Sequence, residues 1–542
     1  MNVMCLNNCG YKWTELPEGC FKGYLQIYGN PKPLRGEEAL RHLSQAESFE
    51  DFQALLKELD GLYAAVLRRE DGAVWAAVDI ARSTPLYYSA DGRFLSDSSP
   101  AVREALGLPR EAADPSALEE LFYCGFISGF RTAYAEIAQI DAGQALEFSP
   151  SGEIRESYYY AHIQKTREIG REETMRLFQQ VSDQVFDEAA AAIAGRPVVL
   201  SLSGGYDSRY VACMLKRRGV EDVSCYTYGR KDSFEVQVSE KIAKALGWRW
   251  TCVEHTDERV MGILDETGQA YARAFEQYDY AFFIQNFPAV RYLHETGWFK
   301  PGSVFLTGLS NDIPAGSHTL QLYETFSSCF SEETLASAAT ESALLNTAQK
   351  PLLDALERQR RGLNLSFTTY QEFSNSVECL QAIRRYSRGA LHMNCPHEYF
   401  GYEYLLPCWN RKLLEFWYSM PLEYRFAQNL FEEWITAGPP AQYGLGQKKT
   451  VLGYSSFRGW ERTKARGRLA LNRLVCMPLG IALREKQDFN NFSPLQAAVF
   501  RQIHQKRLIK FRNSDFNHVF TLSHMEQLYG PRCLEKRGTS KP

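Results

Sequence analysis

Between residues 197 and 253 the chain alternates short apolar segments with segments of helical spacing, and this alternation limits the fold more than any other feature. The apolar segments lie at residues 197–203, 223–228 and 248–253, and amphipathic segments lie at 208–218 and 233–246. Strands that alternate with helices in this order form a parallel sheet, because each helix returns the chain to the same edge. The sequence therefore predicts an α/β unit.

A Ser-Gly-Gly-Tyr-Asp-Ser loop joins the first predicted strand to the first predicted helix. Gly204 and Gly205 would let the backbone approach an anion closely, and Ser203 and Ser208 add hydroxyl donors. Asp207 would repel phosphate unless a cation lay between them, and Mg²⁺ commonly binds carboxylates together with substrate phosphates. The loop therefore predicts a phosphate site with Asp207 as a Mg²⁺ ligand, although a simple helix-capping turn has the same pattern.

No lysine follows the glycines, so the loop differs from the Gly-x-x-x-x-Gly-Lys-Ser/Thr loop of kinases and GTPases. Transfer of the γ-phosphate is therefore disfavoured. Cleavage of ATP at the α-phosphate fits the loop better.

The length of 542 residues predicts two or three compact units, since most domains contain roughly 100–200 residues. Residues 1–160 hold strand-like segments separated by Asp-Gly pairs, which are typical of hairpin turns. A helical stripe begins near residue 168, so we expect a second domain over residues 161–542. Its α/β core would span residues 195–320, and helical patterns, including one at 458–474, would form an extension over residues 320–542.

The composition argues against several classes of protein. A formal net charge of -4 gives no reason to expect a nucleic acid partner, and a solvated helix face explains the basic stretch at 458–484. Neither a signal sequence nor a run of about 18 apolar residues is present, so we expect no membrane span and a cytoplasmic location. The 13 cysteines include no Cys-x-x-Cys pair, which predicts neither a zinc site nor a disulfide framework.

Several segments resemble the asparagine synthetase family in the family's own order. The Ser-Gly-Gly-Tyr-Asp-Ser loop is similar to its pyrophosphate loop, and Val-Phe-Leu-Thr-Gly-Leu-Ser-Asn-Asp resembles its second signature, an apolar strand followed by Ser-Gly-Glu-Gly-Ser/Ala-Asp. Gln-Lys near residue 447 resembles a motif whose lysine contacts pyrophosphate. The matching segments are residues 60–64, 79–82, 85–88, 125–132, 143, 203–208, 304–312, 401–407, 413–416, 420–421 and 447–448.

The resemblance implies a fold and a set of site residues. The fold would be a degenerate α+β amidotransferase-like sandwich, of the class with an N-terminal nucleophile, followed by a parallel-sheet synthetase domain of the pyrophosphate-loop type. Asp207 and Asp312 would hold Mg²⁺, and Lys448 would offset charge on departing pyrophosphate, unless it is simply a solvated lysine. Leu202 and Tyr228 would lie near the adenine, although core packing also explains them. The residues implied to surround ATP are Leu202, Ser203, Gly204, Gly205, Asp207, Ser208, Tyr228, Thr307 and Gly308.

The sequence departs from the family pattern at several positions. The family's glutaminase uses an N-terminal cysteine, whereas Met1 is followed here by Asn2, and Cys5 could serve only after loss of four residues. Leu309 replaces a glutamate that assists ammonia addition. His318 stands where the family often has tyrosine, so a neutral imidazole could accept a proton from the attacking amine, unless backbone groups satisfy a buried histidine there.

These departures leave four functions open. The first is an ATP-dependent, AMP- and pyrophosphate-forming ligase that joins a small-molecule or peptide carboxylic acid to ammonia or an amine. The others are an intramolecular cyclase that makes a β-lactam or macrolactam, a glutamine-hydrolysing asparagine synthase, and an ATP-binding protein without catalytic activity. We expect the first, with ATP and Mg²⁺ required and glutaminase activity lost. The sequence is compatible with a homodimer.

Overall fold

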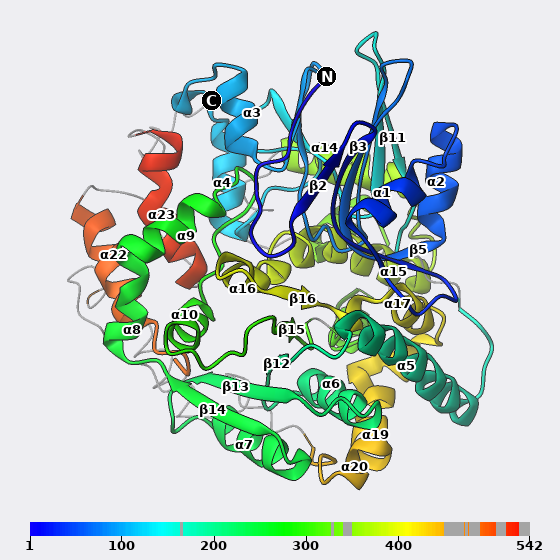
Figure 1. Ribbon diagram of the computed structural model, residues 1–542, viewed down its shortest axis with the longest axis vertical. Coiled ribbons are helices and arrows are strands. Elements are labelled where there is room, and N and C mark those ends of the chain that lie inside the picture. Colours follow the sequence, from blue (N-terminus) through cyan, green and yellow to red (C-terminus); the bar gives the residue numbers. More distant parts are fainter. Residues whose placement is uncertain are drawn as a thin grey trace.

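The computed structural model describes residues 1–162, 166–309, 311–326, 330–339, 350–448, 471, 475, 488–505 and 516–530, so the predicted helix at 458–474 lies almost entirely outside the described residues. Within these residues the strands form three sheets (Figure 1). Two of them are built from the N-terminal strands, coloured blue to cyan at the top of Figure 1, and the third, parallel sheet lies below them.

The parallel sheet has five strands in the order β14-β13-β12-β15-β16. Every neighbouring pair is parallel, with Val198 opposite Val223 on one side and opposite Val304 on the other. From β12 the chain builds outward to β14 and then returns to place β15 on the other side of β12, so the strand order reverses between β12 and β15. The strands are β12 (Val198–Ser201), β13 (Val223–Gly229), β14 (Arg249–Glu254), β15 (Val304–Leu306) and β16 (Glu403–Leu405).

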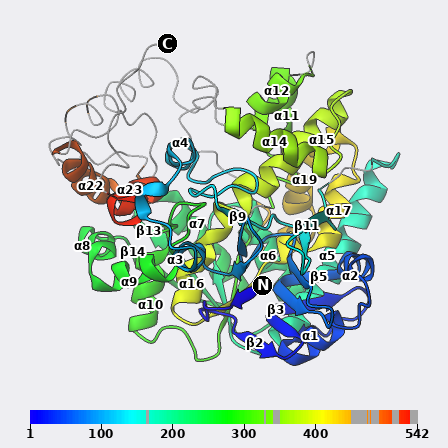
Figure 2. The same ribbon diagram turned by 90° about the horizontal axis from the view of Figure 1, so that it is seen from above.

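Helices supply most of the remaining described structure after residue 170. They are α5 (Arg171–Ile193), α6 (Tyr206–Arg217), α7 (Phe234–Leu246), α8 (Asp257–Met261), α9 (Glu266–Ala274), α10 (Phe287–Glu295), α11 (Thr319–Phe326), α12 (Glu332–Ala339), α14 (Lys350–Gly362), α15 (Tyr370–Gln381), α16 (Cys395–Tyr399), α17 (Arg411–Tyr418), α18 (Leu422–Arg425), α19 (Asn429–Ala437), α20 (Pro439–Gln442), α22 (Ser493–Gln505) and α23 (Phe516–Tyr529). Figure 2 shows α23 beside α4, and Tyr529 of α23 lies 6.4 Å from Tyr134, ring centroid to ring centroid.

Both faces of the parallel sheet are covered, which explains the uninterrupted apolar run of β12. Val198 and Leu200 are buried in a cluster with Phe186 of α5 and with side chains of α6 and α7. Val199 points to the opposite face, because strand side chains alternate, and it is buried in a cluster with Val290 of α10. The predicted α/β unit is therefore confirmed.

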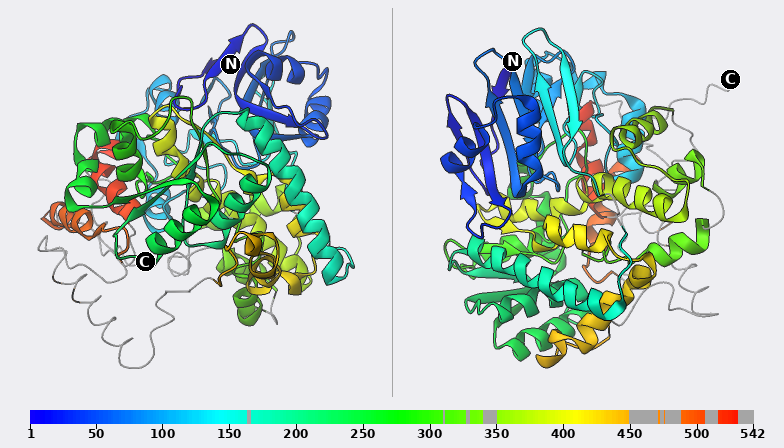
Figure 3. Two further views of the ribbon diagram at one scale, coloured as in Figure 1. Left: turned by 60° about the horizontal axis from the view of Figure 1, so that its bottom comes forward. Right: turned by 90° about the vertical axis from the view of Figure 1, so that its right-hand side faces the viewer.

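The N-terminal strands form a four-stranded sheet of order β1-β8-β7-β9 and a seven-stranded sheet of order β11-β10-β6-β5-β3-β2, in which β4 also pairs with β3. The two views of Figure 3 show these strands at one end of the molecule. The elements are β1 (Asn2–Met4), β2 (Trp13–Leu16), β3 (Gly19–Ile27), β4 (Leu34–Arg35), α1 (Gly36–Leu43), α2 (Phe49–Lys57), β5 (Leu59–Arg68), β6 (Val74–Val78), β7 (Tyr87–Ser89), β8 (Phe94–Ser96), α3 (Ser99–Ala105), α4 (Pro115–Cys124), β9 (Ile137–Gln139), β10 (Gln144–Phe148) and β11 (Ile154–Tyr158).

Alternating side chains build a core on each face of the seven-stranded sheet. Val66 is buried with Tyr88 and Leu95 of the four-stranded sheet. Its neighbour Leu67 faces the other way and is buried in a cluster with Phe52 of α2. The sequence-derived domain boundary at residues 160 and 161 stays a prediction, as does the amidotransferase-like character of this part.

The helix that follows the Ser-Gly-Gly loop begins at Tyr206, two residues earlier than the sequence predicted. Gly205 occupies the N-cap position with an extended backbone and provides no side-chain cap. As a result, Asp207 lies inside the first helical turn rather than before it, and Ser208 occupies the third helical position rather than the first. This difference matters for the site, because first-turn N–H groups point out of the helix end.

Candidate active site

The loops that follow β12 and β15 leave the same edge of the parallel sheet, because the two strands are neighbours and run in the same direction. Residues 202–205 connect β12 to the first turn of α6, and residues 307–309, 311 and 312 are the described residues that follow β15. The strand order reverses between the two strands, and ligands of open α/β sheets bind beyond the carboxyl ends of the strands at such a reversal. The fold thus brings two of the predicted segments to one place.

Gly308 joins the two loops. A Cβ atom at this position would lie 2.6 Å from the carbonyl carbon of Asp207 and 2.7 Å from the nitrogen of Ser208, so no larger residue fits without displacing backbone. The loop after β15 therefore packs directly on the peptide group between Asp207 and Ser208. This contact brings the second predicted segment to the first turn of α6.

Hydrogen bonds between serines shape the loop after β12. The N–H of Ser203 donates to Oγ of Ser208 at 3.1 Å, and the N–H of Gly205 donates to Oγ of Ser203 at 3.2 Å. The two hydroxyl oxygens lie 3.0 Å apart. Because no side chain caps α6, this helix start has the geometry that attracts anions.

The backbone conformation at Gly204 and Gly205 does not require glycine. Gly205 has φ -75°, and Gly204 is not among the residues with positive φ. A Cβ atom at Gly204 would lie 3.5 Å from Cα of Glu235, and one at Gly205 would lie 3.3 Å from the movable hydroxyl of Ser203. The fold alone does not demand glycine at either position, so close approach of a ligand to the backbone is the physical reason that remains.

Some buried polar side-chain atoms in the loop after β15 have no hydrogen-bond partner among the described residues. Thr307 is 2% exposed, and its Oγ1 has no hydrogen-bond partner among the described residues. Asn311 is 0% exposed, and neither atom of its side-chain amide has a partner in the same part of the chain. Buried polar groups are nearly always satisfied, so these atoms point to a polar ligand. The sequence analysis did not identify Asn311 as a site residue. It stands where the family signature has serine or alanine.

The carboxylates of Asp207 and Asp312, the predicted Mg²⁺ ligands, both raise the pKa of two side chains, Cys408 and Tyr386. Burial raises the pKa of Cys408, and the carboxylates of Asp207 and Asp312 raise it further. Burial likewise raises the pKa of Tyr386, with both carboxylates adding to the effect. Charges act in this way only over short separations, so both carboxylates lie near one region. Two carboxylates beside a phosphate loop are the donors that Mg²⁺ uses, and the residues therefore fit the predicted ion.

The segment that contains Lys448 lies against the same loop. Arg209 donates to the carbonyl oxygens of both Gly204, at 2.8 Å, and Gln447. Nζ of Lys448 lies 3.1 Å from Oε1 of Glu432, and Oε2 of the same carboxylate accepts a hydrogen bond from the hydroxyl of Tyr206 at the start of α6. The side chain of Lys448 is 79% exposed and can move toward the loop.

Leu202 and Tyr228 lie at the ends of adjacent strands. The N–H of Leu202 donates to the carbonyl of Tyr226 at 2.9 Å, and its side chain is buried in the core. The ring of Tyr228 is half-buried and stacks on His255, with the two ring centroids 5.1 Å apart. Any contact of Leu202 with a nucleotide would thus involve its backbone, whereas Tyr228 presents an aromatic face at this edge.

Comparison with known proteins bears on these observations. A sequence model of asparagine synthase matches residues 182–539, which is more than half of the chain and includes both loops. The chain belongs to the asparagine synthase family. Membership supports an ATP-dependent ligase that forms an amide or an adenylate, and it implies the use of ATP.

Other comparisons add little to the asparagine synthase assignment. No curated protein sequence is significantly similar to the chain. Among solved structures, the U34-tRNA thiolase NcsA from Methanococcus maripaludis with its 4Fe-4S cluster is 12% identical over 44% of this chain and 86% of that one, with a TM-score of 0.20. A TM-score this low supports no conclusion about fold or activity. In the described residues, no helix has the length and apolar character to cross a membrane.

His318 lies in a buried polar cluster that the asparagine synthase resemblance did not reveal. Its Nε2 is 3.7 Å from Oε1 of Glu378, and Nη2 of Arg425 donates to the same carboxylate oxygen at 2.6 Å. Burial and the charge of Arg425 lower the pKa of His318 to about 4, so its imidazole is neutral near pH 7. Burial raises the pKa of Glu378, while Arg425 opposes that rise.

Neither ring nitrogen of His318 has a hydrogen-bond partner among the described residues. The described backbone therefore does not supply the hydrogen bonds that would explain His318 as a purely structural histidine. Burial raises the pKa of Tyr386, and the carboxylates of Asp312, Asp207 and Glu378 add to this rise, so the same tyrosine is influenced by the cluster and by both predicted Mg²⁺ ligands. The sequence held one sign of this cluster, because Glu378 is a charged residue on the buried face of α15.

Cys5, the residue that could have replaced the glutaminase nucleophile of the asparagine synthase family, does not lie at a chain end. The residues before it form β1, in which Asn2 to Met4 pair with β8. A hydrogen bond to Cys20 and burial raise the pKa of its thiol, which disfavours the nucleophilic thiolate. The structure gives Cys5 no feature of an activated nucleophile.

Proposed function

We propose that this protein uses ATP to adenylylate a carboxylic acid and then joins the acyl group to ammonia or an amine, with release of pyrophosphate and AMP. The observation that carries the proposal is the contact of Gly308 with the peptide between Asp207 and Ser208. It places a phosphate-binding geometry against the loop that carries Thr307 and Asn311, whose polar side-chain atoms lack partners among the described residues. His318 follows six residues after Asp312. A non-catalytic nucleotide site gives no reason for that imidazole.

The proposed ATP site uses this chain's own groups. The N–H groups around Gly205 and the hydroxyls of Ser203 and Ser208 would bind the phosphates. Asp207 and Asp312 would hold Mg²⁺, which when bound supplies positive charge against the phosphate oxygens. Lys448 would move from its exposed ion pair to offset charge on pyrophosphate.

The proposed reaction has two steps. A carboxylate oxygen of the acid attacks the α-phosphorus of ATP, the bond to the bridging oxygen breaks, and pyrophosphate leaves. The amine nitrogen then attacks the acyl carbon, the carbon–oxygen bond to AMP breaks, and the nitrogen loses a proton. His318 would accept this proton, because it is neutral near pH 7 and its ring nitrogens lack partners among the described residues.

The environment of Cys5 bears on which compound donates the nitrogen of the amide. Since its thiol faces Cys20 and lies beyond a paired strand, glutamine hydrolysis by this residue has no structural support. We therefore propose free ammonia or an external amine, with a small molecule or a peptide as the acid. An intramolecular cyclase would use the same groups on a substrate that carries both acid and amine, and only the substrate would differ.

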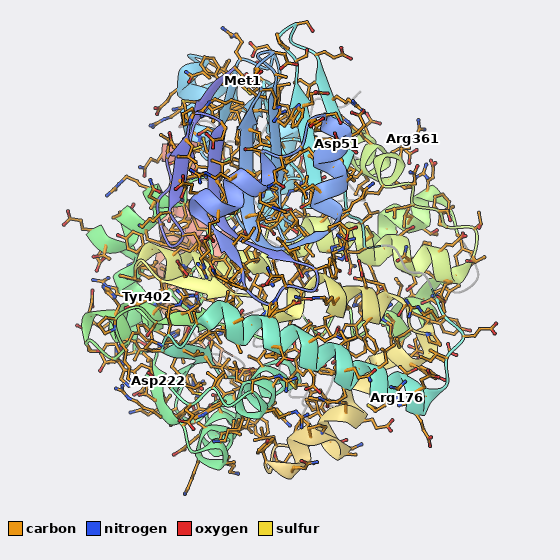
Figure 4. All side chains as sticks on the ribbon, turned by 45° about the vertical axis from the view of Figure 1, so that its right-hand side comes forward. Met1, Asp51, Arg176, Asp222, Arg361 and Tyr402 are labelled. Carbon is orange, nitrogen blue, oxygen red and sulfur yellow. The ribbon has the colours of Figure 1, made fainter. Side chains whose placement is uncertain are left out.

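The test measures Mg²⁺-dependent pyrophosphate release from ATP with a panel of carboxylic acids, aspartate included, and with either ammonium or glutamine as donor. Asp207→Asn removes the proposed metal ligand at the loop. Asp222→Asn is the matched control, because Asp222 precedes β13 and thus lies at the opposite edge of the same sheet, as labelled in Figure 4. We expect release with ammonium in the parent and the control but not in Asp207→Asn.

The possible results of this assay distinguish the ligase from the glutamine-dependent enzyme, the cyclase and the non-catalytic protein. Release with glutamine that Cys5→Ala abolishes would restore the glutaminase and contradict the proposed donor. Release with a bifunctional acid but without any added nitrogen donor would identify a cyclase. Equal release by Asp207→Asn and the parent would contradict the proposed site, and no ATP binding by the parent in calorimetry would contradict the function itself.

A further inference from the structure

Two thiols and a carboxylate meet in the N-terminal sheets, separate from the crevice of the parallel sheet. Ligand atoms of Cys5, Glu15 and Cys20 all lie within 4.8 Å of one another, and no other such group of three acidic, histidine or cysteine residues occurs in the part of the chain that the structure describes. Glu15 and Cys20 are directly opposite each other in the β2–β3 hairpin. Cys5 follows β1, which belongs to the other N-terminal sheet.

Asp97 holds the backbone around this group in place. Its carboxylate accepts hydrogen bonds from the N–H groups of Leu6, at 2.9 Å, and Asn7, at 2.8 Å, which directly follow Cys5. The same carboxylate accepts from Nε1 of Trp13, at 2.7 Å, at the start of β2. The two chain segments that carry the three side chains are thus joined independently of any bound ion, which lowers the entropy that binding would lose.

We propose that Cys5, Glu15 and Cys20 bind one Zn²⁺ ion, which ties the segment after β1 to the β2–β3 hairpin. Zinc accepts thiolate and carboxylate ligands in a tetrahedral arrangement, in which two sulfur ligands about 2.3 Å from the ion lie about 3.8 Å apart. Side chains whose ligand atoms already lie within 4.8 Å reach this spacing by small rotations. Cys20 is buried and Glu15 is exposed, so one side of the site is open and a water molecule can complete the tetrahedron.

Zinc would offset most of the negative charge of its three ligands. Two thiolates and one carboxylate carry three negative charges, and Zn²⁺ carries two positive ones. Arg68 supplies the third positive charge, because its Nη2 lies 3.7 Å from Sγ of Cys20. A donor that hydrogen-bonds a thiolate from outside the coordination shell also orients the ligand. Without the ion, the same groups would leave a net negative charge beside a buried sulfur once both thiols ionised.

A disulfide between Cys5 and Cys20 is the rival arrangement. It would need an oxidant, and it would give Glu15 no role, whereas the hairpin register places this carboxylate against Cys20. The sequence did not indicate the site, because zinc motifs are recognised by closely spaced pairs and these cysteines are separated along the chain. The site requires the contact between the two N-terminal sheets.

The experiment measures zinc in untagged full-length protein, purified with reductant and without chelator, by mass spectrometry of the metal. The variants are Cys5→Ser, Glu15→Gln and Cys20→Ala, with Cys252→Ser as control because Cys252 is also partly exposed but lies in β14. We expect one zinc per chain in the parent and the control. Cys5→Ser and Cys20→Ala should lose it, and Glu15→Gln should bind at least about ten-fold more weakly in a chelator competition.

Cobalt substitution gives a readout that is independent of zinc content. Co²⁺ bound by two thiolates produces sulfur-to-metal charge-transfer absorption, which Cys5→Ser should reduce and Cys252→Ser should not. Absence of zinc from the reduced parent after incubation with excess Zn²⁺ would overturn the proposal. So would a parent mass lower by two hydrogen atoms with Cys5 and Cys20 found in one cross-linked peptide, or zinc retained by a folded Cys20→Ala.

Discussion

Nε2 of His318 lies 3.7 Å from Oε1 of Glu378, whose side chain is fully buried, and both ring nitrogens of His318 are shielded from solvent although its side chain is 22% exposed. Arg425 donates to the same carboxylate oxygen, and burial together with the charge of Arg425 lowers the pKa of His318 to about 4, so the imidazole is neutral near pH 7. In the proposed reaction this imidazole would serve as the base.

Replacement of His318 should slow amide formation without abolishing adenylylation. In His318→Gln, we expect acid-dependent exchange of labelled pyrophosphate into ATP to stay within about three-fold of the parent, while the rate of amide formation falls about 10²- to 10⁴-fold. The matched control is His294→Gln, because His294 is exposed on α10. Equal loss of exchange and amide formation would instead assign His318 to nucleotide or acid binding.

The lowered pKa of His318 also predicts a pH dependence of stability. Between pH 6.5 and about 4 the unfolded chain binds a proton at this residue and the folded chain does not, so its contribution to stability falls as pH falls. From pH 7 to pH 5 we expect the parent to lose about 2 kcal/mol more unfolding free energy than His318→Gln. Urea denaturation at the two pH values measures this difference, and parallel losses in both proteins would contradict the assigned burial.

Gly308→Ala should disrupt the crevice. The added methyl group would lie 2.6 Å from the carbonyl carbon of Asp207, so the two loops must separate. We expect pyrophosphate exchange to fall at least about ten-fold and the unfolding free energy to fall by roughly 1–3 kcal/mol. Gly170→Ala is the control, because nothing lies within 4 Å of a Cβ atom there and its φ is -70°. Unchanged exchange in Gly308→Ala would show that the contact is not needed for ATP use.

The ion pair between Arg82 and Asp279 ties the N-terminal sheets to the rest of the chain. The two side chains are fully buried, with Nη2 and Oδ2 3.1 Å apart, and Tyr87 also donates to Asp279. Arg82→Met should lower the unfolding free energy by about 3–5 kcal/mol, because it leaves an unpaired buried carboxylate. The double variant Arg82→Met, Asp279→Leu should lose less than the single one. Additive losses in this double-mutant cycle would show that the pair is not coupled.

Much of the fold was readable from local sequence. The apolar runs at β12, β13 and β14 identified strands, because a strand covered on both faces needs apolar residues on both. The Ser-Gly-Gly loop predicts a phosphate site from local sequence, because glycine and an uncapped helix start act within a few residues of each other. Local chemistry of this kind depends on neighbours in the chain, and a sequence records those neighbours directly.

The tertiary structure alone decided which distant side chains meet. Asn311 departs from the family signature around it, and Glu378 belongs to no motif. Only the structure shows that the buried amide of Asn311 has no partner among the described residues and that Glu378 lies beside His318. Cys5 and Cys20 come together only because strands of two sheets pack against each other. The sequence thus determined the segments and their local chemistry, whereas the charge, burial and contacts of each site arose from strand order and packing, which depend on the whole chain at once.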